Sequence, residues 1–223
     1  MYFNAIDIYS LIFLSFITFF STVSPINCLI IYLNLTDEFT KEERKYVATK
    51  SVLIAAIITI VFTLIGPSGF KLIGIEIYSV KIAGGIVLAV VAVGMVFGGN
   101  KQITKAQVGY KKNIAVVPLA LPIISNPPTI VSSIILFAEY NNLILKGIVI
   151  LMLILNFALV YLLFSMSDLL AKVLKKSVLN VLFILTGILL TALSVQFIVT
   201  GIKDSGVLQK FSYNTNNQNK KGK

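Results

Sequence analysis

The sequence contains no histidine and only one cysteine, Cys28. The absence of histidine excludes acid–base catalysis and metal ligation by that side chain. A single cysteine excludes an intramolecular disulfide, and we interpret Cys28 as a small buried core residue. No lysine or arginine precedes Lys41, so we expect no cleaved signal peptide, which requires a positive first region. No pairing of a nucleophile with a base is visible, so we do not expect an enzyme.

Charge is also scarce: charged residues make up 13% of the 223 residues, whereas hydrophobic residues make up 57%. Soluble domains typically carry about 25% charged residues. With a mean hydropathy of +0.92, the composition predicts an integral membrane protein surrounded by a lipid bilayer. The net charge is +10, but the basic residues lie in segments between apolar runs. We therefore attribute them to anionic headgroups and membrane topology rather than to nucleic acid.

Apolar runs long enough to cross a bilayer, which takes about 20 residues in a helix, occur six times. They predict an all-α membrane protein with a single polytopic domain over residues 1–211 and a disordered polar tail over 212–223. Gly66-Pro67 should end the second run and leave Ser68 to Val80 as a re-entrant or interfacial segment. The expected spans are Ile8 to Leu35, Tyr46 to Ile65, Val80 to Phe97, Ile114 to Phe137, Leu143 to Met166 and Val178 to Ile202.

Two shorter patterns lie between the spans. Thr40 is followed three residues later by Glu43, which is the capping-box pattern at the start of a helix. Ser167 to Ser177 contains apolar and basic residues at an amphipathic spacing, which predicts a short interfacial helix.

The basic residues also predict an orientation. Eleven of them lie on one side of the six spans and three on the other, before the tail is counted. The positive-inside rule then places the basic segments in the cytoplasm and both termini outside the cell (inner or plasma) membrane. The five lysines after Ile202 oppose this assignment, but only Lys203 and Lys210 lie close to the last span.

A polar segment containing proline interrupts two of the apolar runs. The first break is Ser21-Thr22-Val23-Ser24-Pro25-Ile26-Asn27, and the second break is Ser125-Asn126-Pro127-Pro128-Thr129. Proline in a helix removes a backbone donor and clashes with the preceding turn, and lipid cannot satisfy the freed groups. We therefore expect helices 1 and 4 to be broken at Pro25 and Pro127, and the two breaks to meet and form the working site.

The two halves of the sequence align with each other when one is shifted by 102 residues. At this offset Pro25 falls on Pro127, Gly85 on Gly187 and Gly99 on Gly201, without a gap. The match predicts an internal duplication, with repeat 1 at about residues 8–100 and repeat 2 at about 114–202. Each repeat holds three spans, so the two copies should lie in opposite orientations, as in many secondary transporters.

The breaks should provide polar groups for a ligand. Each second half-helix would present free N–H groups to an anion, with a capping residue and a proline at its start. The carbonyls that end the first half-helices suit an ammonium group or a small cation. No acid or base lies near either break, which favours a zwitterionic amino acid over a charged ligand. The candidate substrate-binding residues are Ser24, Pro25, Asn27, Ser125, Asn126, Pro127 and Thr129.

Other conspicuous residues have simpler interpretations. The glycines Gly84, Gly85, Gly94 and Gly187 predict close packing between helices rather than ligand contacts.

Three polar residues within or beside the spans leave alternatives open. For Asn156 in the fifth span we expect an interhelical hydrogen bond, with substrate contact as the alternative. We interpret Glu76 and Lys81 as interfacial charges whose side chains reach the membrane surface, with a functional pair as the alternative.

Several motifs resemble those of a known family. Ser24-Pro25-Ile26-Asn27, followed by Tyr32-Leu33-Asn34-Leu35-Thr36, resembles the D-P-I-G-N-x-P-I-F-L-x-L-T signature of the MarC family. Ile82-Ala83-Gly84-Gly85-Ile86 is similar to its R-I-A-G-G-I-L stretch, and Val117-Pro118-Leu119-Ala120-Leu121-Pro122 to its V-P-L-A-I-P segment. The MarC family comprises six-span inner-membrane proteins and includes SnatA-type small neutral amino acid transporters. The resemblance implies an inverted-repeat fold, transport of glycine- or alanine-like substrates, and roles for the matching break residues.

The chain departs from the family pattern at four positions. Ser24 replaces the usual aspartate, and Lys81 replaces an arginine. Asn126 and Pro128 stand where the family usually has glycine, and their side chains leave less space at the second break.

We therefore expect a secondary transporter of small neutral amino acids that works by alternating access around the two breaks. Coupling to Na+ or H+ is open, as are the direction of transport and the oligomeric state, and we expect no other cofactor and no metal. The alternative is a non-transporting membrane scaffold or regulatory protein that retains the transporter fold. A passive channel fits the matched breaks less well.

Overall fold

The computed structural model describes residues 5–97, 114–173 and 176–206, and every regular element in these ranges is helical. The predicted tail over 212–223 and the basic segment over 98–113 lie outside the described residues. The elements are α1 (Ala5–Val23), α2 (Pro25–Leu35), α3 (Lys41–Leu72), α4 (Ile77–Phe97), η3 (Ala115–Ile124), α5 (Pro127–Glu139), α6 (Leu143–Ser165), α7 (Ser167–Val173) and α8 (Lys176–Asp204).

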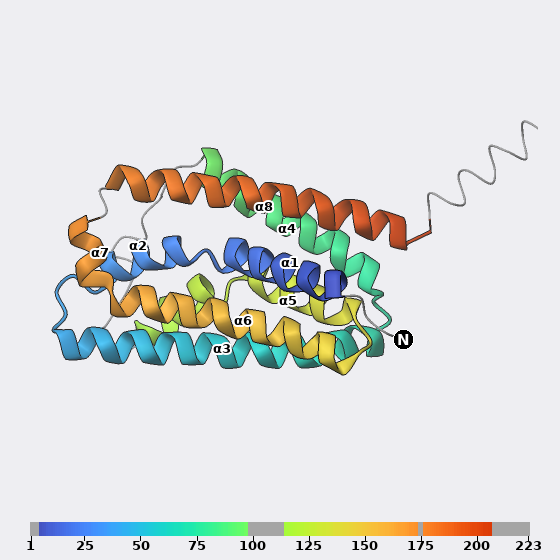
Figure 1. The fold of residues 1–223 in the computed structure, drawn as a ribbon, viewed down its shortest axis with the longest axis horizontal. Coiled ribbons are helices and arrows are strands. Elements are labelled where there is room, and N and C mark those ends of the chain that lie inside the picture. Colours follow the sequence, from blue (N-terminus) through green and yellow to red (C-terminus); the bar gives the residue numbers. More distant parts are fainter. Residues whose placement is uncertain (1–4, 98–113, 174–175, 207–223) are drawn as a thin grey trace, which may run out of the picture.

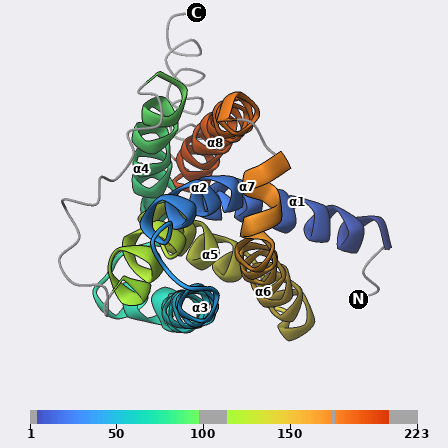
Figure 2. The same cartoon turned by 90° about the vertical axis from the view of Figure 1, so that its left-hand side faces the viewer.

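The long helices run side by side along one axis (Figure 1). In the view along the bundle, α2 and α5 lie between the α4–α8 pair on one side and α3 with α6 on the other (Figure 2). The contacts between elements agree with this arrangement, because α5 touches α1, α3, α4 and α6. Both the start of α1 and the end of α8 lie at the same end of the bundle (Figure 1).

Five helical stretches are long and apolar enough to cross a membrane, and the count is six if η3 and α5 form one span bent by 54°. This confirms the predicted all-helical, multi-pass class. The first span, Ile8–Leu35, is the central one, because 61% of its most apolar window is buried, against 22–39% in the others. Its polar residues are therefore shielded from lipid by the neighbouring helices.

The predicted end of the second span at Gly66-Pro67 is wrong, because α3 continues through Pro67 to Leu72. Proline removes only one hydrogen bond, and a helix can continue beyond it when neighbouring contacts hold its last turns. A Cβ at Gly66 would lie 2.8 Å from the Ile134 side chain, so α3 packs tightly against α5 at this level. The segment from Ser68 to Val80 is consequently not re-entrant; it holds the last turn of α3, a short turn and the start of α4.

The predicted capping box at the start of α3 is confirmed. Thr40 Oγ1 accepts from the Glu43 N–H at 3.3 Å, and the Glu43 carboxylate accepts from the Thr40 N–H at 2.9 Å. The short helix predicted within Ser167 to Ser177 is α7. Both elements were recognisable because their signals are local in the sequence.

Glycines set the distance between α4 and α8. A Cβ at Gly85 would lie 2.6 Å from the Ile198 side chain, and one at Gly187 would lie 2.9 Å from Met95. Gly84 faces α5, where a Cβ would lie 2.2 Å from Val131. These three glycines are packing residues, as predicted. For Gly94 the prediction is wrong within the described residues, because no atom from another part of them lies within 4 Å of its Cβ position.

Candidate functional site

The two breaks lie against each other. Asn126 Nδ2 of the second break donates to the Thr22 carbonyl of the first break at 2.8 Å. The Ser132 hydroxyl, one turn into α5, lies 3.4 Å from Thr22 Oγ1. The fold therefore brings together two polar segments that are about a hundred residues apart in the sequence.

Ser24 links α1 to α2 in a left-handed conformation, with φ 52 and ψ 64. The prediction that its side chain caps α2 is wrong, because a capping residue needs an extended backbone to reach the first N–H groups. The Ser24 hydroxyl is instead buried without a partner among the described residues. Hydrogen bonds from Ser24 N to Phe20 O and from Cys28 N to Ser24 O nevertheless hold α1 and α2 in one continuous span.

The N-terminus of α2 retains two free backbone donors. Pro25 has no N–H, and the Cys28 N–H is bonded to the Ser24 carbonyl at 3.1 Å. No acceptor among the described residues bonds the N–H groups of Ile26 or Asn27. The Asn27 side chain is half-buried and likewise makes no hydrogen bond within the described part of the chain. At the first break, these backbone and side-chain groups are therefore unbonded within the described part of the chain.

The second break is closed by its own residues. Asn126 caps α5, as predicted: its Oδ1 accepts from the Thr129 N–H at 2.8 Å and from Thr129 Oγ1 at 2.9 Å. Pro127 and Pro128 carry no N–H. The prediction of free N–H groups at this break is therefore wrong, because two prolines remove the first donors and Asn126 binds the third.

Hydroxyl pairs tie the second break to α3. Ser125 and Thr59 share a hydrogen bond of 2.8 Å between their hydroxyls, and Thr63 Oγ1 donates to Ser133 Oγ at 2.7 Å. All four residues are fully buried. Of these four residues only Ser125 was predicted from the sequence, although the spacing of Thr59 and Thr63 places both on one face of an apolar helix.

Backbone acceptors are also present at the first break. The Ser21 carbonyl has no donor four residues later because residue 25 is proline. The Thr22 carbonyl is bonded by Asn126, and the Val23 carbonyl accepts from the Cys28 thiol at 3.2 Å. Of the carbonyls that end α1, Ser21 is therefore the acceptor that the break leaves for a ligand.

Four of the buried polar atoms that lack a partner in the described residues belong to the first span: the hydroxyls of Ser15, Thr18, Ser21 and Ser24. The fifth is Asn156 Oδ1 on α6. Asn156 Nδ2 donates to Met152 O at 2.9 Å and, across the helix interface, to Phe16 O at 3.4 Å, which confirms the predicted interhelical bond. The spacing of three residues between the hydroxyls was the signal that could have identified them.

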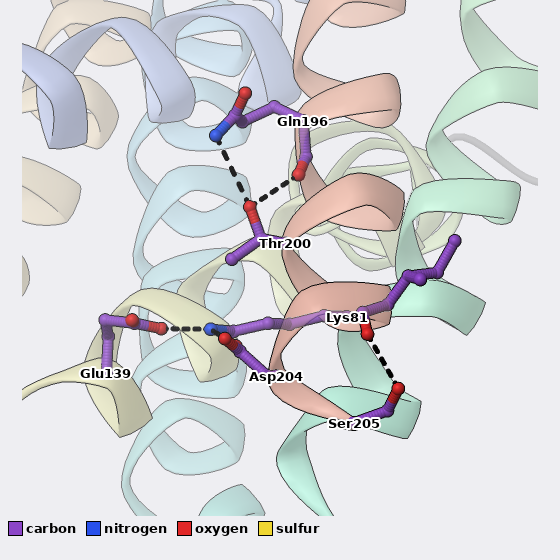
Figure 3. A network of polar contacts seen from close by, with 7 residues as sticks. Lys81, Glu139, Gln196, Thr200, Asp204 and Ser205 are labelled. Carbon is purple, nitrogen blue, oxygen red and sulfur yellow. Dashed lines mark hydrogen bonds and ion pairs between the residues drawn. The ribbon is translucent and has the colours of Figure 1, made fainter. Parts of the chain in front are cut away.

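Lys81 is buried at one end of the bundle, with 4% of its surface exposed. Its Nζ donates to the Glu139 carboxylate and, at 2.8 Å, to Asp204 Oδ2 (Figure 3). The alternative of a functional pair with Glu76 is wrong, because Lys81 pairs with Glu139 and Asp204 instead. Glu139 and Asp204 are the last residues of α5 and α8, and their carboxylates reach the ammonium group of Lys81 on α4 directly.

A cavity of about 320 Å³ lies at the opposite end, beside the C-terminal half of α2. Tyr32 fixes this end of α2, because its hydroxyl donates to the Arg44 carbonyl at 2.8 Å and its ring stacks on Phe164 at 4.1 Å. Arg44 pairs with Asp168 at the start of α7. The lining residues are Tyr32, Lys41, Arg44, Lys45, Ala48, Phe164, Ser165, Ser167 and Asp168.

Comparison with known proteins assigns the chain to a family. The model described as MarC family integral membrane protein matches residues 9–205. This chain belongs to the MarC family. The resemblance noted in the motifs is thereby confirmed, and the MarC assignment agrees with the apolar helices of the structure.

Curated relatives of this MarC protein come from archaea and bacteria. A UPF0056 membrane protein of Methanocaldococcus jannaschii is 33% identical over 195 residues, which cover 85% of this chain and 95% of that protein. The UPF0056 membrane protein YhcE of Escherichia coli is 35% identical over 196 residues, covering 84% and 90%. One from Aquifex aeolicus is 30% identical, covering 85% and 91%. These names specify a membrane protein and no substrate, and no solved structure matches the chain.

Proposed function

We propose that this protein is a secondary transporter of small neutral amino acids such as glycine and alanine, with its binding site at the first break. The observation that carries the proposal is the pair of free N–H groups of Ile26 and Asn27 next to the unpartnered Ser24 hydroxyl. Each buried polar group without a partner costs about 1–3 kcal/mol. A substrate carboxylate would satisfy these donors, and the start of α2 favours negative charge.

The remaining groups of the site favour a zwitterion. The Ser21 carbonyl and hydroxyl can accept hydrogen bonds from an ammonium group. The hydrogen-bonded network of the two breaks consists of hydroxyls, amides and backbone groups, and no ionised side chain belongs to it within the described residues. A ligand with net charge would therefore be bound without a counter-ion, at a cost of at least a few kcal/mol in a membrane.

The α4–α8 contact supports the inverted repeat that alternating access requires. Gly85 packs against Ser194 and Ile198, whereas Gly187, its counterpart at the offset of 102, packs against Ala92, Met95 and Val96. Residues 92 and 96 are themselves the counterparts of 194 and 198. The contact is thus reciprocal, which is expected when two copies of one unit pack about a twofold axis. Two such units could rock against each other around the breaks.

The two ends of the bundle differ in a way that suits one state of a transport cycle. The cavity beside α2 opens at the end that carries Lys41, Arg44 and Lys45, whereas Lys81 and its carboxylates close the other end. By the positive-inside rule, the cavity end faces the cytoplasm and both termini lie outside the cell membrane.

Uptake of labelled glycine or alanine into proteoliposomes tests the function, with Asn27→Leu as the critical variant. Asn27 makes no hydrogen bond with the described residues, so its loss should spare the fold and lower uptake at least about tenfold, the effect of roughly 1.4 kcal/mol of lost binding. Asn34→Leu is the matched control, because residue 34 lies two turns along the same face of α2.

Absence of uptake and of exchange for every small neutral amino acid, under both sodium and proton gradients, would contradict the proposal. Correct folding of the reconstituted protein would be established by its thermal unfolding transition. That result would favour the alternative of a non-transporting scaffold, for which the self-satisfied second break is the supporting observation.

A further inference from the structure

A row of hydroxyls follows α1 from the first break toward its N-terminus. It consists of Ser24, Ser21, Thr18 and Ser15, which we call the hydroxyl row. Ser15, Thr18 and Ser21 are three residues apart on α1, so each lies about 4.5 Å further along the helix axis and about 60° around it, and Ser24 follows directly after α1. All four are at least 95% buried, and none of their hydroxyls has a partner in the described part of the chain. The row is therefore a series of buried polar groups that winds along α1 inside an apolar bundle, and we call it the polar track.

The lack of partners distinguishes this row from other hydroxyls of the same protein. Serine and threonine in apolar helices usually donate to the carbonyl three or four residues earlier. Thr22, Thr59 and Thr63 do so, bonding to Phe19, Ala55 and Thr59 respectively. The members of the row do not, although their helix offers the same carbonyls. Leaving four buried hydroxyls unbonded raises the free energy of this packing and favours a state that admits water or solute.

An acceptor on the neighbouring helix completes the track. Asn156 of α6 donates to the Phe16 carbonyl, which places its amide beside the N-terminal half of the row. Its Oδ1 is fully buried and has no partner among the described residues. The track thus offers hydroxyls, which both donate and accept, and a carbonyl oxygen that only accepts. Such a mixture suits a zwitterion and its accompanying water molecules.

The hydroxyl row runs from the first break toward one end of the bundle. It leads from the break to the end of the bundle where α1 starts and where α5 and α8 end (Figure 1). That end is closed by Lys81, Glu139 and Asp204, and the cavity beside α2 lies at the opposite end. The break therefore has a cavity toward one side and a packed polar track toward the other.

We propose that the hydroxyl row and Asn156 form a collapsed half-channel, which opens between α1 and α6 to connect the first break with the end that bears Lys81. Water and a small zwitterionic solute are the ligands that its chemistry fits. The identity of the solute rests on the proposed function, whereas the entry of water does not. Opening requires α1 to separate from α6, and alternating access would require the cavity end to close in the same state.

Cysteine accessibility tests this half-channel. In a Cys28→Ala background, the substitutions Ser15→Cys, Thr18→Cys and Ser21→Cys each replace a hydroxyl by a thiol of similar size. A small, membrane-impermeant methanethiosulfonate reagent is applied to proteoliposomes from each side, with and without saturating glycine. We expect all three thiols to react from one side only, and glycine to change the rate several-fold.

Two matched variants calibrate the labelling. Phe13→Cys lies on α1 at the same depth, but residue 13 is 68% exposed on the outer surface of the bundle, where lipid excludes the reagent. Glu42→Cys lies in the exposed first turn of α3 and should react fully. Thiols of the row should react at least about tenfold faster than the one at position 13. Reaction at position 42 together with rates in the row no higher than at position 13 would overturn the proposal.

A second variant removes the hydroxyl without relying on cysteine chemistry. Thr18→Val keeps the side-chain shape but deletes the unpartnered oxygen, so we expect a higher melting temperature and slower entry of the labelling reagent at position 21. A lower melting temperature would show that the hydroxyl is satisfied in the folded protein and would also overturn the proposal. Labelling of the row without uptake of any amino acid would instead reject the proposed substrate and support the half-channel.

Discussion

Ser24 combines two unfavourable features at one residue. Its left-handed backbone costs an L-residue about 1–2 kcal/mol, and its buried hydroxyl has no partner in the described chain. Conformational strain of this kind persists only where the surrounding structure imposes it, and it is concentrated at functional sites. At this position the strain keeps the N–H groups of Ile26 and Asn27 free while α1 and α2 remain one span.

Ser24→Gly is expected to stabilise the protein by about 1 kcal/mol, because glycine adopts positive φ without penalty. The same substitution should weaken glycine binding if the hydroxyl contacts the carboxylate. The melting temperature in detergent and the KM for uptake measure the two effects. Ser125→Gly is the control: Ser125 has a negative φ of −90 and bonds to Thr59, so stability should fall. A lower melting temperature for Ser24→Gly would contradict the strain argument.

At the scale of helices, the interface between α4 and α8 depends on glycines, which have no side chain to keep the two backbones apart. Gly85 and Gly187 allow the two backbones to approach, and a Cβ at Gly85 would lie 2.8 Å from the Ser194 carbonyl oxygen. Backbone atoms cannot move aside as a flexible side chain can. The glycines therefore determine the separation of the two helices, and with it the contact between the proposed repeats.

Gly85→Ala is expected to lower the free energy of unfolding by about 1–3 kcal/mol, the usual cost of overpacking. Gly94→Ala is a matched control on the same helix, because its Cβ position has no neighbour within 4 Å from the other described elements. There the higher helix propensity of alanine should raise stability by up to about 1 kcal/mol. Thermal unfolding of both variants in one detergent gives the comparison. Equal melting temperatures would refute the assignment of Gly85 as a packing residue.

At the scale of the whole molecule, a charged cluster stands at each end of an otherwise apolar bundle. Lys81 joins α4 to the ends of α5 and α8 (Figure 3). Arg44 joins α3 to α7 and donates to the Thr36 carbonyl after α2. Both clusters bridge elements that the proposed cycle moves relative to each other. They are suited to stabilise one state by contacts that the other state lacks.

Lys81→Met removes the cation between two carboxylates, and we expect a loss of about 1–3 kcal/mol, the range for hydrogen bonds to charged groups. Glu139 and Asp204 remain partly hydrated, because 44% of each side chain is exposed, which limits the loss. Lys81→Arg should retain most of the stability, since a guanidinium can bind both carboxylates. Chemical unfolding measures these differences, with the exposed Lys71→Met as control. If Lys81→Met changed the free energy of unfolding no more than Lys71→Met does, the cluster would not stabilise the protein.

Local signals in the sequence predicted a substantial part of the fold. Long apolar runs identified the membrane class, because the bilayer sets a minimum helix length. The pair Thr40 and Glu43 identified the start of α3, since a capping box involves residues only three apart. Pro67 does not end α3 as its local effect on a helix predicts, because Gly66 packs against Ile134 and α3 continues across the proline.

By itself, the sequence determined that this is a multi-pass helical membrane protein and placed polar segments around Pro25 and Asn126, because hydropathy and proline act within a few residues. Only the tertiary structure decided which polar groups remain available. It brought the Asn126 amide of the second break to the Thr22 carbonyl of the first, paired Ser125 with Thr59 of α3, and brought Glu139 and Asp204 to Lys81. Each of these outcomes depends on groups that different helices bring together, and no short-range pattern in the chain encodes such contacts.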